Sequence, residues 1–367
     1  MEQKKHRTGR IVRRIIILLL VLLIAGGCFF TVHSMHKVFS RGDYPDQRFS
    51  PMTRFSDLGP AYSREMVSFR SGDNMLVGYI YGQENDKGLI VWSHGIGCGH
   101  EAYLEEILWF ADRGWRVFAY DGTGCGESEG SGSLGLPQSA LDLNCALDFA
   151  ERDLRLAGIP VMLVGHSWGG YAVGAVLNYD HRVRAAVSIS GYSDPMEMLT
   201  EGAEQMAGKI GSLLTYPFIW GYNRLLFGHN LSRTAVSGIN YSGIPVLVLH
   251  GEHDTDVSYD RCGIIAKQDQ IQNMRVTFET LTGEYADHNS FFLSDEANAY
   301  RRETEQAYHE LSGQKGRNLS DAEMLAFLEG VDRTRYNECN SALLERIERF
   351  LTENLPEPPA DDTATPS

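Results

Sequence analysis

The sequence predicts an α/β fold: a mainly parallel sheet with helices on both faces. Short apolar segments alternate with helical segments from residue 88 to residue 281, as in parallel strands joined by crossover helices. Within this pattern the stretch from Pro160 to Gly174, PVMLVGHSWGGYAVG, places Gly-x-Ser-x-Gly between a strand and a small-residue helix. An uncharged apolar run over residues 15–32 predicts a transmembrane helix in front of the domain.

The composition excludes some classes of function. The chain has 367 residues, of which 43% are hydrophobic and 22% charged, and a net charge of -15. This acidity argues against a nucleic-acid partner. The six cysteines show no paired metal spacing and do not fit a disulfide framework, although a single bridge stays open. No His, Asp or Glu cluster has metal-ligand spacing, so we expect no metal and no cofactor. The sequence indicates no specific protein partner.

The N-terminus predicts a membrane address. Residues 1–14 are strongly basic and precede the apolar run 15–32, which favours a single-pass signal anchor in the cell membrane. The N-terminus is then cytoplasmic and the rest of the chain extracytoplasmic. Two alternatives stay open: a cleaved signal peptide, which would have a shorter apolar core, and a lipoprotein signal with Cys28 lipidated.

The remaining segments follow in order. Residues 33–62 are polar and contain prolines, which indicates a tether. Residues 63–81 alternate apolar and polar side chains around Ser71-Gly72-Asp73-Asn74 and predict a β-hairpin. The further strands are expected at 88–92, 116–120, 161–164, 183–188, 244–249 and 276–281, with helices at 101–113, 138–157, 170–177 and 340–355. The domain then spans 63–354, and the Pro- and Asp-rich tail 355–367 is expected to be disordered.

Two long segments interrupt the alternation of strands and helices. Residues 195–243 are too long for an ordinary loop and predict a helical cap over the site. This segment is unusually aromatic, so its inner face is expected both to pack and to contact substrate. Residues 295–332 are charged and predict a second helical insertion.

The chemistry starts from Ser167 at the centre of the Gly-x-Ser-x-Gly turn. A serine hydroxyl needs a base and an orienting acid to act as a nucleophile. Sites in open α/β sheets lie at the carboxyl ends of the strands. Asp254 follows the strand at 244–249, and His288 follows the strand at 276–281. The resulting order Ser, Asp, His differs from that of other serine-triad folds.

At this point the chain resembles the α/β-hydrolases, and among them the serine aminopeptidase, monoacylglycerol-lipase and lysophospholipase-like group. The resemblance covers roughly residues 63 to 292 and the final helix. Its four landmarks are His94-Gly95-Ile96-Gly97, Asp121-Gly122-Thr123-Gly124-Cys125-Gly126-Glu127-Ser128, Gly165-His166-Ser167-Trp168-Gly169 and His250-Gly251-Glu252-His253-Asp254.

The resemblance implies a role for each matching residue. Ser167 would be the nucleophile, Asp254 the acid and His288 the base, and the backbone N–H groups of Ile96 and Trp168 would form the oxyanion hole. The chain departs from the family pattern in the second landmark, which usually carries an Arg where this chain has Gly122 or Thr123; this should affect loop packing rather than chemistry. The segment 295–332 is also longer than the usual link to the last helix.

Several residues compete for these roles. Asp256 is a rival for the role of the acid. His253 and His166 are expected to pack locally. His94 is expected to hold the loop of the first landmark, residues 94–97, which we call the oxyanion loop. Cys98 and Cys125 are expected near the mouth of the site.

The function predicted is a membrane-anchored serine esterase that cleaves small acyl or lipid-like esters through an acyl-enzyme on Ser167. One alternative is an aminopeptidase-type peptidase, with Glu197, Glu201 and Glu204 of the cap as candidates to bind the substrate amine. The other is an acyltransferase.

Overall fold

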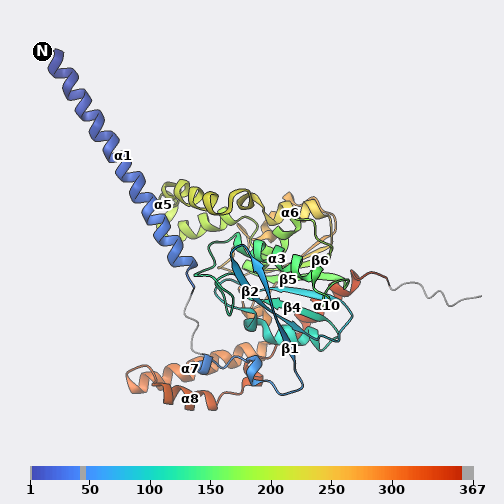
Figure 1. Cartoon of the computed structure of the whole chain (residues 1–367). Coiled ribbons are helices and arrows are strands. Elements are labelled where there is room, and N and C mark those ends of the chain that lie inside the picture. Colours follow the sequence, from blue (N-terminus) through green and yellow to red (C-terminus); the bar gives the residue numbers. More distant parts are fainter. Residues whose placement is uncertain (1, 42–46, 358–367) are drawn as a thin grey trace, which may run out of the picture.

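The structure is a computed structural model that describes residues 2–41 and 47–357 (Figure 1). Residues 42–46 of the predicted tether and residues 358–367 of the predicted disordered tail lie outside the described residues. The strands are β1 (Arg64–Ser71), β2 (Asn74–Tyr81), β3 (Leu89–Ser93), β4 (Arg116–Tyr120), β5 (Val161–His166), β6 (Val183–Ile189), β7 (Val246–Gly251) and β8 (Val276–Leu281). The α-helices are α1 (Glu2–Phe39), α2 (Leu104–Ala111), α3 (Gln138–Arg152), α4 (Trp168–Ala175), α5 (Pro195–Phe227), α6 (Ala235–Ser242), α7 (Asp295–Lys315), α8 (Asp321–Glu329), α9 (Arg333–Tyr336) and α10 (Ser341–Glu353).

The strands form one eight-stranded sheet in the order β1-β2-β4-β3-β5-β6-β7-β8. The six strands from β4 to β8 in this order pair in parallel, and β1 and β2 are antiparallel at one edge. The pairing of Ser71 with Asn74 closes the predicted hairpin around Gly72, whose φ is +56°. The prediction of a mainly parallel sheet is therefore confirmed.

Helices cover both faces of the sheet because the central strands are apolar on both sides. Along β5, Leu163 belongs to one core with Leu143 of α3 and Val173 of α4. The neighbouring Val164 belongs to the opposite core, with Ile107 of α2 and residues of α10. Alternate residues of a strand point to opposite faces, so a strand buried on both sides has a continuous apolar run.

The helix predicted over 138–157 is wrong at its C-terminal end. α3 stops at Arg152, and Asp153 is extended with φ -78° and ψ 126°. The Asp153 carboxylate accepts hydrogen bonds from the backbone and side chain of Arg155, which favours a turn over continued helix. Leu154, which would lie on the apolar face if the helix continued, is 97% exposed.

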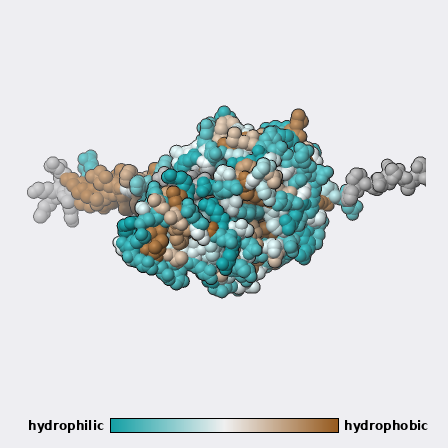
Figure 2. Space-filling model, turned by 90° about the horizontal axis from the view of Figure 1, so that it is seen from below, coloured by the Kyte–Doolittle hydropathy of each residue, from teal (hydrophilic) through white to brown (hydrophobic). Residues whose placement is uncertain are grey.

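α1 leaves the domain as a single long helix (Figure 1). Among the described residues it is the one helix long and apolar enough to cross a membrane, over Arg10–Phe39. Its exposed apolar part is the brown rod that projects from a mostly teal body in Figure 2. Its last turns pack on the domain, where Thr31, Met35 and Phe39 are buried.

The segment predicted as a cap contains α5 and α6. Gly208 has φ 69° and ψ 172° and divides α5 into two arms. The Ser212 hydroxyl of the second arm donates to the Thr200 carbonyl of the first at 3.1 Å, so the arms lie side by side as a hairpin. The segment predicted as the second insertion forms α7 and α8, at the opposite end of the molecule from α5 in Figure 1.

Candidate active site

Ser167 lies in a sharp turn between β5 and α4. Its φ of 57° and ψ of -113° are strained for a residue with a Cβ. The two flanking glycines permit this turn by close backbone approach. A Cβ on Gly165 would lie 2.3 Å from the Gly169 oxygen, and one on Gly169 would lie 2.0 Å from the Ser93 oxygen. Only glycine fits these two positions without moving the backbone.

The structure brings Ser167, His288 and Asp254 into one hydrogen-bonded chain. Ser167 Oγ lies 2.8 Å from His288 Nε2, and His288 Nδ1 lies 2.7 Å from Asp254 Oδ2. Asp254 follows β7 and His288 follows β8, so both come from loops at the carboxyl ends of parallel strands. This is the edge of the sheet where α/β folds assemble their sites.

Asp254 is held as a carboxylate by four donors. Its Oδ1 accepts the backbone N–H groups of Asp256 and Val257 at 3.0 and 2.9 Å. Its Oδ2 lies 3.2 Å from His250 Nε2, in addition to the contact with His288. Burial acts to raise the pKa of Asp254, but hydrogen bonds from His250 and His288 outweigh it, so the pKa lies well below its ordinary value.

The rival acid Asp256 contributes its backbone to this arrangement. Its N–H donates to Asp254 while its side chain is exposed. His253, in the same loop, is 60% exposed and lies beside Glu252. Neither side chain is hydrogen-bonded to His288 among the described contacts.

His166 is buried, as expected for local packing, and is also hydrogen-bonded to the backbone of His288. Its Nε2 lies 2.8 Å from the His288 carbonyl, and its Nδ1 lies 2.8 Å from the Tyr103 hydroxyl. A carbonyl only accepts, so Nε2–H donates and the unprotonated Nδ1 accepts from Tyr103. Burial and the nearby His288 lower the pKa of His166 to about 3, which keeps this ring neutral.

Tyr103 links this support to the predicted oxyanion loop. Its hydroxyl oxygen accepts the Gly95 N–H at 3.1 Å while its proton goes to His166. The motif search missed Tyr103 because it lies in a short 3-10 helix, η3 (His100–Tyr103), with no motif around it. His250 was also missed, although its place at the end of β7 was a usable signal.

His94 holds the same loop from the other side. The Gly122 N–H donates to His94 Nε2 at 2.8 Å, so Nδ1 carries the proton that the Gly95 carbonyl accepts at 2.6 Å. Gly122 is one of the two positions at which the family pattern is expected to have an Arg, and here its backbone N–H holds His94. Ile96, next along the chain, lines the same cavity as Ser167. Trp168 is the first residue of α4, so its N–H has no acceptor within that helix.

Ser167 and His288 open into a cavity of about 520 Å³. Part of the wall comes from segments distant in the sequence, which we call the remote wall: Met52, Thr53, Met198, Arg301 and Asn337. Within the described residues, Met198 is the cap's sole contribution to the lining. The inner face of the cap thus reaches the cavity through Met198, while the aromatic side chains of the cap are absent from the lining; Tyr216, Trp220 and Tyr241 are 42%, 47% and 65% exposed.

The cap glutamates considered for amine binding are engaged in other contacts. Glu197 pairs with Lys267 at 2.6 Å and Glu204 with Arg261 at 3.0 Å. Glu201 accepts a hydrogen bond from Ser258. The acidic side chains that do line the cavity include Glu105 and Glu106 of α2.

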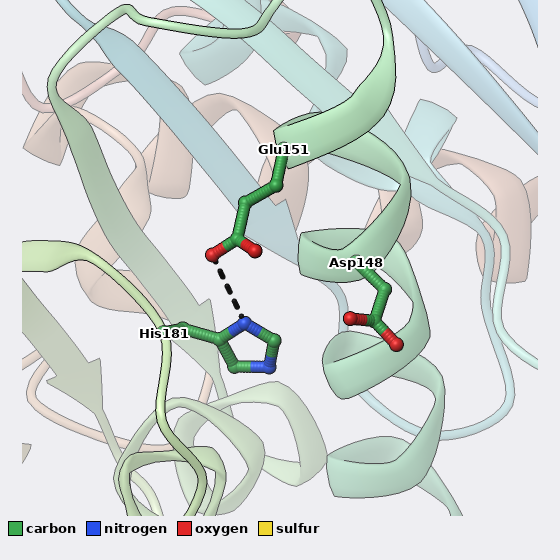
Figure 3. Close-up of side chains that lie close together, drawn as sticks. All are labelled: Asp148, Glu151 and His181. Atoms are coloured by element: carbon green, nitrogen blue, oxygen red, sulfur yellow. Dashed lines mark hydrogen bonds and ion pairs between the residues drawn. The ribbon is translucent and has the colours of Figure 1, made fainter.

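The cysteines and one acidic cluster are not part of the hydrogen-bonded chain of Ser167, His288 and Asp254. All six cysteines are free. Cys98 lines the cavity, as expected, whereas Cys125 is buried in the core. The fold also brings together Asp148, Glu151 and His181, which spacing did not predict (Figure 3). Glu151 lies 3.2 Å from His181 Nδ1 and Asp148 lies 3.4 Å from Arg152, the contacts of a charged surface patch.

Comparison with known proteins gives a family match and several distant relatives. The family model described as serine aminopeptidase, S33 matches residues 84–221. The polyketide transferase af380 of Aspergillus fumigatus is 28% identical over 132 residues, which cover 35% of this chain and 45% of that protein. The chain therefore spans less than half the length of this curated relative.

Two solved esterase structures are similar at low identity. An esterase of Pyrococcus furiosus is 15% identical, with 74% of this chain and 95% of that chain covered and a TM-score of 0.49. The esterase Est1E of Butyrivibrio proteoclasticus with bound ferulic acid is 18% identical, with 60% and 90% covered and a TM-score of 0.47.

The matched stretch 84–221 contains the oxyanion loop and Ser167 and ends before Asp254 and His288. Those two residues are brought to Ser167 by β7 and β8 of the same sheet. With its eight-stranded, mainly parallel sheet and the sharp turn at Ser167 the chain has the α/β-hydrolase fold, and its residues 84–221 are similar to the serine aminopeptidase, S33 family.

Proposed function

We propose that this α/β-hydrolase is a membrane-anchored serine esterase that cleaves carboxylic esters of small acyl or lipid-like substrates. The observation that carries the proposal is the hydrogen-bonded chain from Ser167 through His288 to Asp254, with Ser167 opening into the cavity. An activated serine at a cavity is the requirement for acyl transfer through a covalent intermediate.

The protonation states follow from the contacts. Asp254 is a carboxylate, so His288 Nδ1–H donates to it and His288 Nε2 is free to accept the Ser167 proton. Ser167 Oγ attacks the ester carbonyl carbon as its proton moves to Nε2. The N–H groups of Ile96 and Trp168 donate to the oxyanion that forms.

The tetrahedral intermediate then collapses. The bond from carbon to the alcohol oxygen breaks, and His288 gives its proton to the leaving alcohol, which leaves an acyl group on Ser167. A water molecule attacks this acyl group as its proton moves to His288. The carboxylic acid departs as Ser167 Oγ takes that proton back.

We infer membrane anchoring from α1, whose apolar residues are exposed along the run 15–24. The basic residues before this run favour a cytoplasmic N-terminus, which puts the catalytic domain outside the cytoplasm. Alkaline extraction of membranes from cells that express the full chain tests the anchor. Recovery of the protein in the extract rather than in the membrane pellet would contradict it.

A panel of p-nitrophenyl esters and amino-acid p-nitroanilides, with purified full-length protein, tests the reaction. We expect ester turnover, and for Ser167→Ala a loss of kcat on the order of 10⁵-fold. Ser232→Ala, which changes an exposed serine, is the matched control and should behave as wild type.

The alternatives give different results in the same panel. The family description and the acidic Glu105 and Glu106 in the cavity favour a peptidase as the second candidate, and faster turnover of anilides than of esters would establish it. Product formation that requires an added alcohol acceptor would instead indicate an acyltransferase, an activity in keeping with the name of the fungal relative.

A further inference from the structure

The free end of the α5 hairpin presents apolar side chains to its surroundings. We define the cap tip as Met206, Ile210, Leu213 and Leu214, which are 86%, 77%, 74% and 66% exposed. Residues 210, 213 and 214 are spaced by three and four positions and so lie on one face of the helix. An exposed apolar cluster of this kind marks a contact surface more often than a scattered single residue does.

The other faces of this arm are already covered by protein. Ser212, Ile219 and Asn223 are buried toward the first arm and the domain. A third side of the arm contacts α1. The Phe218 ring lies so close to Gly27 of α1 that a Cβ on Gly27 would be 2.6 Å from the ring. Among the described residues, Leu225 of the same arm is also 89% exposed, but the cap tip is where several exposed apolar side chains gather.

The contact with α1 sets the position of the cap tip relative to a membrane. Gly27 belongs to the uncharged run 15–32, so Phe218 touches α1 within the segment proposed to cross the bilayer. In Figure 1 the end of the α5 hairpin lies beside α1. Leu214 of the cap tip is four residues from Phe218 in the same helical arm, so we infer that the cap tip lies at the boundary of the same membrane.

The charge of the cap differs from that of the chain as a whole. The chain carries 48 Asp and Glu residues and a net charge of -15. From Gln205 to Gly251, however, it contains no Asp or Glu and keeps Lys209, Arg224 and Arg233. Lys209 is exposed within the cap tip region. Glu204, just before this stretch, is paired with Arg261. Apolar side chains next to Lys209 suit the surface of a bilayer that contains anionic lipids.

We propose that the cap tip docks into the leaflet nearest the catalytic domain of the bilayer that α1 crosses, as a second membrane contact. Its apolar side chains enter the boundary between head groups and acyl chains, and Lys209 meets anionic head groups. The proposal rests on the membrane anchor of the proposed function and not on ester hydrolysis. Docking holds the cap and α1 at the same surface, so the catalytic domain does not rotate freely about its tether.

The test measures the depth of a probe in the full-length chain. Leu213→Cys, in a chain whose six native cysteines are replaced by serine or alanine, is labelled with an environment-sensitive fluorophore and reconstituted in liposomes of phosphatidylcholine and phosphatidylglycerol. Brominated acyl chains then quench fluorophores that lie in the leaflet. Leu154→Cys is the matched control, because Leu154 is also an apolar residue and is 97% exposed. We expect fractional quenching at position 213 roughly threefold above that at position 154.

The outcomes separate the steps of the proposal. Equal quenching at positions 213 and 154 overturns docking, and cross-linking between copies through position 213 with no quenching assigns the cap tip to a protein contact instead. A label on Cys28, in a chain whose other five cysteines are replaced, tests the anchor itself. Without quenching there, α1 does not cross the bilayer and the proposal loses its basis. Replacing phosphatidylglycerol by phosphatidylcholine should lower quenching at position 213 and not at Cys28. An unchanged value at position 213 would overturn the role of anionic lipid. Failure of ester turnover leaves all these readings unaffected.

Discussion

Two sides of the cavity differ in where their residues come from in the chain. On one side Ser167, His288 and Asp254 follow three strands of one sheet and are fixed by short hydrogen bonds. On the other side, the remote wall takes Met52 and Thr53 from before the domain, Met198 from the cap, and Arg301 and Asn337 from the C-terminal part. The triad side is supported by the rigid core, whereas the remote wall depends on packing between separate segments. We therefore expect changes on the triad side to reduce the rate, and changes in the remote wall to alter substrate choice.

The largest expected effect is on the triad side, at Asp254. Asp254→Asn replaces the carboxylate that fixes the His288 tautomer, so kcat for a p-nitrophenyl ester should fall by about 10⁴-fold. Asp256→Asn is the matched control, because only the backbone of Asp256 contacts Asp254, and it should stay near wild type. A greater loss for Asp256→Asn than for Asp254→Asn would reverse the assignment of the acid.

Glu106 lines the same cavity as Ser167 and Arg301. Its carboxyl should make the free energy of unfolding depend on pH. Burial raises the pKa of Glu106 from 4.5 to about 7, while Arg301 of the remote wall opposes this rise. The folded state therefore favours the protonated carboxyl, and its contribution to stability is lost as pH rises from about 4.5 to 7. The free energy of unfolding of Glu106→Gln minus that of wild type should therefore be larger at pH 8 than at pH 4, by roughly 3 kcal/mol.

Urea unfolding of both proteins across this pH range measures the effect. Glu105→Gln, on the same helix and half-buried, shows how much any glutamate substitution changes the curve. If the free energies of unfolding of wild type and Glu106→Gln change with pH in parallel, burial does not raise the pKa of this carboxyl.

A smaller effect is expected at Tyr103, which supports the triad side without touching the nucleophile. Tyr103→Phe leaves the Gly95 N–H and His166 Nδ1 without their shared hydroxyl. Each is buried, so the free energy of unfolding should fall by about 1–3 kcal/mol and kcat by about 10-fold as the oxyanion loop loosens. Tyr62→Phe, with a 3.4 Å contact to Asp112 at the surface, is the control. An unchanged kcat would show that the oxyanion loop does not need this link.

The smallest expected effect belongs to the remote wall. Met52→Ala enlarges the cavity away from the triad, so kcat for an acetate ester should change less than about 3-fold. The ratio of kcat/KM for longer over shorter acyl chains should shift by up to about 10-fold. Met274→Ala, at a residue 95% exposed, is the control. A fall in acetate turnover as large as that of Tyr103→Phe would remove the distinction between the two sides.

The sequence alone was enough for the strands and for the nucleophile turn. A strand buried on both faces appears as a short apolar run, and the turn at Ser167 needs glycines at two fixed positions, so both leave a local signal. Helix ends were predicted less well. Nothing in the apolar pattern at Leu154 showed that Asp153 would bind Arg155 and end α3 early.

What only the tertiary structure decided are the contacts between distant segments. The sequence gives Asp254 and His288 in the right order, but it does not show that His166 and Tyr103 hold the base and the oxyanion loop together. It marks residues 195–243 as helical and aromatic, but not that the aromatic side chains lie away from the cavity and that one of them meets α1. The physical reason is that a hydrogen bond or an apolar contact across the chain has no periodicity or spacing, and it forms only when the sheet has brought its partners together.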